Sequence, residues 1–176
     1  MAAPERQEDC ARAVLFDWGD TLMQVFPESI GPMIEWPVVA LMPGAAEALK
    51  QLHASWTIVL ATNARDSQET EIRAALDRVG ISTWIDEIYC YKRTGILKPD
   101  PAFFAFIGEE LGLLPDRMVM VGDSLENDVI GAETAGLHAV WYQQGAGVEN
   151  IASRRGVKNL QDLPLMLESI VVCDQG

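Results

Sequence analysis

Polar and charged residues with the chemistry of phosphoryl transfer stand where the apolar runs of this sequence end. Asp17 follows the first run, and Thr62 and Asn63 follow the second. Asp123 follows the fourth run, and Lys98 stands between the third run and the next expected helix. Phosphoryl transfer needs a carboxylate nucleophile, a cation that neutralises phosphate oxygens, a hydroxyl that orients them, and carboxylates that hold a hard metal ion. Together these residues supply all four kinds of group.

The apolar runs are short and rich in β-branched or aromatic residues, which is typical of buried strands. We predict five strands, at Ala13–Phe16, Trp56–Ala61, Glu87–Tyr91, Arg117–Val121 and His138–Tyr142. Amphipathic segments between and after them predict helices over Pro43–His53, Asp66–Val79, Pro101–Leu111, Glu126–Ala135 and Leu160–Val171. Alternating strands and helices favour right-handed crossovers and a mostly parallel sheet covered on both faces. We therefore expect an α/β fold, a single Rossmann-like three-layer domain over residues 1–176 with a five-stranded sheet.

Local signals mark several expected helix ends. Asp66 with Glu69 has the spacing of a capping box. Asp100 precedes a proline in the first helical position, and Gly136 follows the fourth helix as a usual C-terminal stop.

Each candidate residue also has a purely structural interpretation. Asp17 could cap a turn, and Thr62 with Asn63 is common turn chemistry. Lys98 could be a solvated lysine, and Asp123 could be an acid that the dipole of a helix favours in its first turn. The carboxyl ends of parallel strands meet at one sheet edge, where ligands bind in such folds. All of these candidate residues are expected at this one edge. Their shared position favours the functional interpretation over four separate structural ones.

Four ordered segments resemble the motifs of the haloacid dehalogenase superfamily of hydrolases. Phe16–Leu22 (FDWGDTL) resembles the first motif, and Leu60–Asn63 (LATN) is similar to the second. Gly95–Pro101 (GILKPDP) resembles the third, and Val121–Gly136 (VGDSLENDVIGAETAG) resembles the fourth, an acidic metal site. The resemblance spans Val14 to about Tyr142.

The resemblance implies a magnesium site and a nucleophile. Asp17 would attack phosphorus and form an aspartyl-phosphate intermediate. Mg²⁺ would be held by the carboxylates of Asp17 and Asp123 and by the backbone carbonyl of Gly19. Asp128 would support these ligands through water or hydrogen bonds.

The resemblance also implies how a small phosphorylated substrate is bound. Thr62 and Asn63, with nearby backbone N–H groups, would bind phosphate oxygens. Lys98 would neutralise charge on Asp17 and on the phosphoryl group, because two carboxylates and a phosphate dianion cannot share a dry site without cations.

The first motif departs from the usual phosphatase pattern at Gly19. Phosphatases of this superfamily have a second aspartate there, which protonates the leaving group and later activates water. Asp20 is adjacent, but it can act as the acid/base only if the turn points its side chain inward. The loss of this group predicts a slow phosphatase or one selective for good leaving groups.

The chain leaves little room for a cap domain. Residues 23–42 separate the first motif from the first helix and contain three prolines, which suits a short flap and not a helical cap. The resemblance is therefore to the capless branch, in which the active site is open. The flap is rich in apolar residues, which either pack beneath it or form a contact with a second copy of the chain or with substrate; they are Met23, Val25, Phe26, Ile30, Met33, Ile34 and Trp36.

Composition limits the partners. The 176 residues include 13 basic and 26 acidic side chains, a formal net charge of −13. Such a chain is repelled by nucleic acid and by anionic membranes, so we expect neither as a partner. No apolar stretch has transmembrane length, and Met1–Arg12 lacks the apolar region of a signal peptide. Cys10, Cys90 and Cys173 have no metal-type spacing, so we expect reduced thiols in a cytoplasmic protein.

These observations lead to one main hypothesis and two alternatives. The main one is a Mg²⁺-dependent phosphatase acting on a small phosphomonoester. The alternatives are a dehalogenase or another hydrolase of carbon–heteroatom bonds, and a non-catalytic module that binds metal and phosphate.

Overall fold

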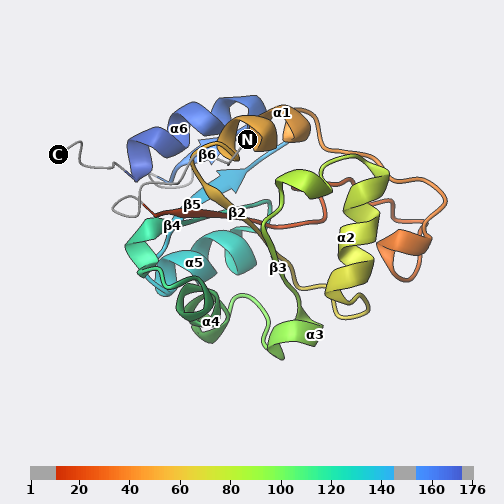
Figure 1. Ribbon diagram of the computed structural model, residues 1–176, viewed down its shortest axis with the longest axis horizontal. Helices are drawn as coiled ribbons and strands as arrows, with labels where there is room; N and C mark the ends of the chain where they lie inside the picture. The colour runs from red at the N-terminus through yellow and green to blue at the C-terminus, as the bar shows by residue number, and fades with distance from the viewer. Residues whose placement is uncertain (1–10, 145–153, 172–176) are drawn as a thin grey trace, which may run out of the picture.

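The computed structural model describes residues 11–144 and 154–171. The strands among them form one parallel sheet of six strands (Figure 1). The strand order is β3-β2-β1-β4-β5-β6, and each strand pairs with its neighbours in parallel. The strands are β1 (Ala13–Phe16), β2 (Thr57–Ala61), β3 (Glu87–Tyr89), β4 (Met118–Gly122), β5 (His138–Tyr142) and β6 (Gly156–Val157). The predicted α/β class with a parallel sheet is confirmed.

The predicted number of five strands is wrong, because β6 adds a sixth strand beside β5. Gly156 pairs with Trp141, and Val157 pairs with Tyr142. Two residues are too few to form an apolar run, so β6 depends on the edge of β5 and gives no signal of its own in the sequence.

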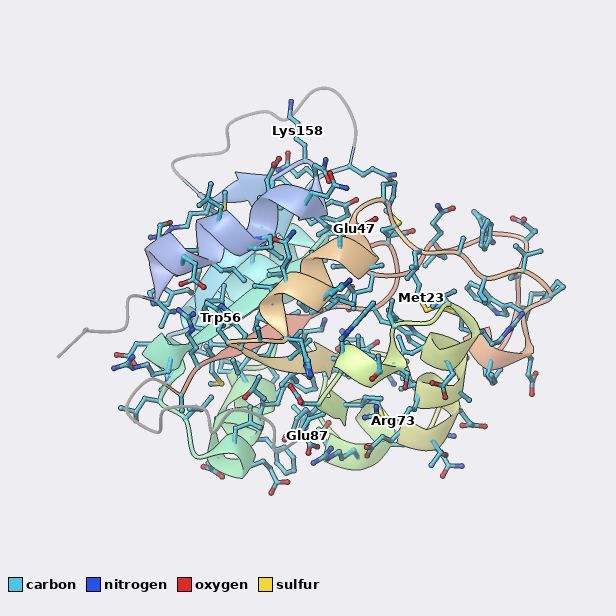
Figure 2. The ribbon with its side chains drawn as sticks, turned by 45° about the horizontal axis from the view of Figure 1, so that its top comes forward. Met23, Glu47, Trp56, Arg73, Glu87 and Lys158 are labelled. Carbon is cyan, nitrogen blue, oxygen red and sulfur yellow. The ribbon has the colours of Figure 1, made fainter. Side chains whose placement is uncertain are left out.

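The sheet is covered on both faces because the buried strand residues alternate between them (Figure 1). Val14 and Phe16 belong to one core cluster, which also holds buried residues of α1 (Ala45–Leu52), α2 (Glu69–Arg78) and α6 (Leu163–Ile170). The other cluster packs against the remaining strand face and contains buried residues of α4 (Pro101–Leu111) and α5 (Gly131–Thr134). In the first cluster, Trp56 (labelled in Figure 2) also donates its indole N–H to Glu168 Oε1 of α6 (3.3 Å).

The central position of β1 brings the candidate site together. Phe16, the last residue of β1, is in register with Leu60 of β2 and Val121 of β4. The backbone N–H of Asp17 then donates to the carbonyl of Val121 (3.0 Å). The residues that follow β1, β2 and β4 therefore lie at the same edge of the sheet.

The helix ends agree with the sequence in part. The Asp100 carboxylate caps α4 by accepting from the Ala102 N–H (2.9 Å), as predicted. Gly136 follows the fourth helix with a φ of +88°, which suits the predicted stop. The predicted capping box is wrong, because α2 begins later and its box pairs Gln68 with Glu71.

Two short helical turns were not predicted. The fourth helix opens with a π-helical turn, Leu125–Ile130, before α5 begins. The third apolar run stops as a strand at Tyr89, and the chain turns into α3 (Tyr91–Thr94). Both turns lie just after a strand, at the edge that carries the candidate site.

Residues 23–42, the segment for which we predicted a flap, contain one turn of 3₁₀ helix at Met33–Glu35. Met33 and Trp36 are buried in the first core cluster, so part of the flap's apolar content packs beneath it. Ile30 is 91% exposed. Arg78 of α2 fixes the flap by donating to the carbonyls of Ile34 (3.0 Å) and Trp36 (2.7 Å).

No helix in the described ranges is long and apolar enough to cross a membrane. Cys90 is a buried free thiol, and Cys10 and Cys173 lie outside the described residues.

Removing the guanidinium of Arg78 should loosen the flap. Arg78→Met leaves the Ile34 and Trp36 carbonyls without this donor, and we expect the free energy of unfolding to fall by about 1 kcal/mol. Limited proteolysis should cut residues 23–42 faster than in the wild type. Lys50→Met is the control, because Lys50 is an exposed cation of α1. Equal cleavage and stability in both variants would contradict this role.

Candidate active site

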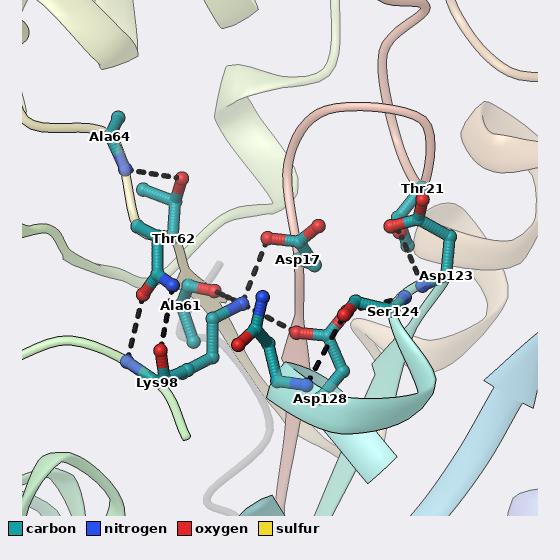
Figure 3. A network of polar contacts seen from close by, with 11 residues as sticks. Asp17, Thr21, Ala61, Thr62, Ala64, Lys98, Asp123, Ser124 and Asp128 are labelled. Atoms are coloured by element: carbon teal, nitrogen blue, oxygen red, sulfur yellow. Dashed lines mark hydrogen bonds and ion pairs between the residues drawn. The ribbon is translucent and has the colours of Figure 1, made fainter. Parts of the chain in front are cut away.

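The ammonium of Lys98 lies at the centre of the candidate site (Figure 3). Its Nζ donates to Asp17 Oδ1 (2.8 Å), to Asp128 Oδ1 (2.7 Å) and to the carbonyl of Ala61 (2.7 Å). A lysine ammonium has three protons, so these three acceptors use all of its donors. The side chains of Lys98 and Asp128 are each 1% exposed, whereas that of Asp17 is 16% exposed. Asp17 is thus the member of this network that solvent or a ligand can reach.

Asn63 positions Lys98 through two hydrogen bonds to its backbone. The Asn63 side-chain N–H donates to the Lys98 carbonyl (2.9 Å), and Asn63 Oδ1 accepts from the Lys98 N–H (2.8 Å). We predicted that Asn63 binds substrate, but in this structure the Lys98 backbone engages both ends of its amide. Gly131 of α5 supports the same segment, since a Cβ there would lie 2.9 Å from Pro99 Cβ.

Asp128 is held in a space that Gly122 leaves open. A Cβ on Gly122 would overlap the Asp128 carboxyl group. Asp128 Oδ2 accepts from the Ser124 N–H (3.0 Å) while Oδ1 binds Lys98. The absence of a side chain at residue 122 is therefore a requirement of the site. No role was predicted for this glycine, although it lies within the fourth motif.

Asp123 lies beside Thr21, a second residue to which the sequence analysis gave no role. Thr21 Oγ1 donates to Asp123 Oδ1 (3.3 Å) and accepts from the Asp123 N–H (3.2 Å). Trp141 Nε1 donates to the Asp123 carbonyl (2.9 Å). These contacts connect the first motif directly to the fourth.

Asp17, Asp123 and Asp128 each offer a carboxylate oxygen, and these oxygens lie within 4.8 Å of one another. Hard oxygen ligands at this spacing suit Mg²⁺. The carbonyl of Gly19, the further metal ligand that the sequence predicts, accepts no backbone hydrogen bond from any residue that the structure describes. Three carboxylates beside one ammonium leave an excess of negative charge, and the donor set therefore fits a divalent cation.

Burial and this excess of negative charge shift the pKa values of the ionisable groups in the site. Burial raises the pKa of Asp128 to about 6, against the opposing effect of Lys98. Desolvation, together with the charges of Asp17 and Asp128, raises the pKa of Asp123 to about 6. Burial alone would lower the pKa of Lys98, but Asp17 and Asp128 outweigh it and raise that pKa. Lys98 is therefore a permanent cation at neutral pH.

Thr62 is buried at the end of β2 with its hydroxyl oriented by the backbone (Figure 3). Thr62 Oγ1 accepts from the Ala64 N–H (3.1 Å), and the Thr62 N–H donates to the Tyr89 carbonyl (2.9 Å). The hydroxyl proton remains available to donate to an anionic oxygen.

Asp20 does not join the carboxylate cluster. Its Oδ1 accepts from the Val25 N–H of the flap (2.9 Å), and the residue is exposed. The structure thus groups Asp17, Lys98, Asp123 and Asp128 and leaves Asp20 on the flap side of the turn.

Removing the Lys98 charge should destabilise the protein strongly. Lys98→Met leaves Asp17 and Asp128 without their cation, and we expect a loss of about 3–5 kcal/mol in urea unfolding. Adding Asp128→Asn removes the buried charge and should restore part of that loss. If the double variant is as unstable as Lys98→Met, charge burial is not the cause.

Without a metal ion, the site should make the protein less stable as the pH rises. A folded-state pKa of about 6 lies above the ordinary aspartate value, so folding takes up protons between about pH 4 and pH 6. The resulting stabilisation is present below this window and is lost as the pH rises through 6. Urea unfolding in EDTA at pH 5 and pH 7 measures it. Asp123→Asn should reduce the difference between the free energies of unfolding at the two pH values. Glu126→Gln, which changes an exposed neighbour, should leave it unchanged. Equal differences in both variants would contradict the role of Asp123 in the pH dependence.

Comparisons with known proteins identify relatives of this chain. Residues 31–136 match the sequence profile of the haloacid dehalogenase-like hydrolases. Pyrimidine 5′-nucleotidase YjjG of Escherichia coli is 29% identical over 130 residues, which are 72% of this chain and 56% of that protein. N-acylneuraminate-9-phosphatase of Rattus norvegicus is 33% identical over 127 residues, 69% of this chain and 50% of that protein. This chain therefore spans about half the length of the curated relatives it matches.

A solved structure shares nearly the whole fold. The crystal structure of an uncharacterized protein from Listeria monocytogenes serotype 4b superposes with a TM-score of 0.78 at 29% identity. The match covers 90% of this chain and 98% of that one. With a family profile matched over more than half of its residues and this architecture, the chain belongs to the haloacid dehalogenase-like hydrolases.

Proposed function

We propose that this hydrolase is a Mg²⁺-dependent phosphatase that cleaves a small phosphomonoester through an aspartyl-phosphate on Asp17. The observation that carries the proposal is the network around Lys98, which joins Asp17 to Asp128 at the edge where the strands end. A buried permanent cation beside a partly exposed carboxylate suits a site that receives a phosphate dianion.

In this proposal, each residue of the network has a defined task. Lys98 holds one oxygen of Asp17 and offsets the repulsion between that carboxylate and the incoming phosphate. An Asp17 carboxylate oxygen forms a bond to phosphorus as the ester P–O bond breaks. Water then attacks phosphorus, releasing inorganic phosphate and the free carboxylate. The Thr62 hydroxyl, oriented by Ala64, donates to a phosphate oxygen in both steps.

Asp17, Asp123 and the Gly19 carbonyl would hold Mg²⁺, and Asp128 would support them through its contacts with Lys98 and Ser124. When bound, the ion supplies positive charge that stabilises the phosphoryl oxygens.

The relatives support a phosphatase more than the two alternatives. Both curated relatives described above carry names that denote phosphate-ester hydrolysis. A dehalogenase has no need of a cluster of three carboxylates that suits a cation, and a module that only binds phosphate has no need of a nucleophile held by Lys98. Because the chain covers about half of each relative, their substrates are not transferred to it.

Hydrolysis of p-nitrophenyl phosphate tests the proposal. We expect turnover with Mg²⁺, loss of turnover in EDTA, and loss in Asp17→Asn of at least about 10³-fold, because the nucleophile is removed. Glu126→Gln is the matched control, an exposed acid near the cluster that should retain wild-type turnover.

Turnover that persists in Asp17→Asn would refute the aspartyl-phosphate route. Folded wild-type protein that releases halide from a 2-haloacid and no phosphate would favour the dehalogenase instead.

A further inference from the structure

The side chain of Val25, a flap residue that is 42% exposed, lies against Gly19. A Cβ built on Gly19 would lie 2.8 Å from Val25 Cγ2, closer than carbon atoms can approach. Gly19 does not have the left-handed backbone that excludes side chains. The obstacle to a side chain at residue 19 is therefore Val25 and not the backbone.

Asp20 fixes Val25 in this place. Asp20 has a φ of +56°, the one residue other than glycine with a positive φ in the described part of the chain. Its Oδ1 accepts from the Val25 N–H (2.9 Å), and its own N–H donates to the Met23 carbonyl (2.7 Å). A strained backbone persists only where its surroundings hold it, and these two hydrogen bonds supply that support. The turn thus holds the Val25 side chain against Gly19, two residues after Asp17.

In the described part of the chain, no titratable side chain near Asp17 is free to protonate a leaving group once the site is loaded as proposed. Of the titratable side chains that contact or closely approach Asp17, Lys98 already uses its three protons on protein acceptors. Both oxygens of Asp128 accept hydrogen bonds, and in the proposed function Asp123 would be an ionised ligand of the metal ion. Asp20 is bound to the flap backbone.

We infer that the substrate is a phosphate compound whose leaving group departs as a stable anion, such as an aryl phosphate or an acyl phosphate. This inference rests on the proposed phosphatase function and names its substrate class. The P–O bond to the leaving group breaks as the bond from Asp17 to phosphorus forms. The leaving oxygen keeps the electron pair and takes its proton later from solvent. Val25 contacts the apolar part of the leaving group, where an acidic side chain would otherwise protonate it.

The test compares kcat/KM for p-nitrophenyl phosphate, acetyl phosphate and ethyl phosphate, because this ratio reports the first step of the reaction. General acid catalysis contributes about 10²–10⁴-fold, and alkyl phosphates depend on it most. We expect the wild type to favour p-nitrophenyl or acetyl phosphate over ethyl phosphate by more than about 100-fold. The better of the two favoured substrates distinguishes an aryl from an acyl leaving group.

A pair of double variants isolates the cause. Gly19→Asp with Val25→Ala places a carboxyl group in the space that Val25 vacates, and should raise the ratio of ethyl to p-nitrophenyl turnover by about 100-fold. Gly19→Asn with Val25→Ala has nearly the same shape but cannot act as an acid, so its ratio should stay near that of Val25→Ala alone. Circular dichroism checks the fold of each variant.

Three outcomes overturn the inference. One is a wild type that cleaves ethyl phosphate within about 10-fold of p-nitrophenyl phosphate, since a missing acid costs more than this. Another is an equal gain in the asparagine variant. A third is wild-type protein with no turnover of any of the three, which overturns the phosphatase proposal as well; the first two leave that proposal standing. If the double variants do not fold, the wild-type comparison decides.

Discussion

The buried contact of Lys98 with Asp17 and Asp128 is the constraint on which the rest of the site depends. Charges in a protein interior are tolerated only when each is paired and hydrogen-bonded. Three nearby features of the chain serve that pairing. Gly122 leaves room for the Asp128 carboxyl group, Ser124 binds its second oxygen, and Asn63 fixes the backbone of Lys98. The parallel sheet brings these residues to a common edge, and the local contacts hold their charged side chains in place there.

The same contact leaves the site with unbalanced charge. One ammonium cannot neutralise three carboxylates, and burial together with that imbalance raises the pKa values of Asp123 and Asp128. A bound divalent cation would restore neutrality among Lys98 and the three carboxylates, and it would leave the site able to accept the negative charge of a phosphate. Stability and ligand binding are thus linked through one electrostatic balance, as in many sites that sacrifice stability for function.

Much of this arrangement was predictable from sequence, and the exceptions share a cause. The strands of the core, the cap at Asp100 and the meeting of Asp17, Lys98 and Asp123 follow from apolar runs and from the residues that end them. The two-residue strand β6 follows from its pairing with β5, which lies earlier in the chain. The position of Val25 against Gly19 follows from a contact across a turn. Patterns along the chain report burial and periodicity; they do not report which backbone passes close to which.

The order of strands has a consequence for the synthesis of the chain. β1 lies between β2 and β4, so its first partner leaves the ribosome about 40 residues after it and its second about 100 residues after it. Until β4 emerges, one edge of β1 is an open template for pairing with other chains. Lys98 likewise lacks one of its two carboxylate partners until Asp128 has been synthesised. Between the synthesis of β1 and that of β4, the nascent chain is therefore exposed to aggregation through this edge. The long sequence separation of the pairing also slows folding.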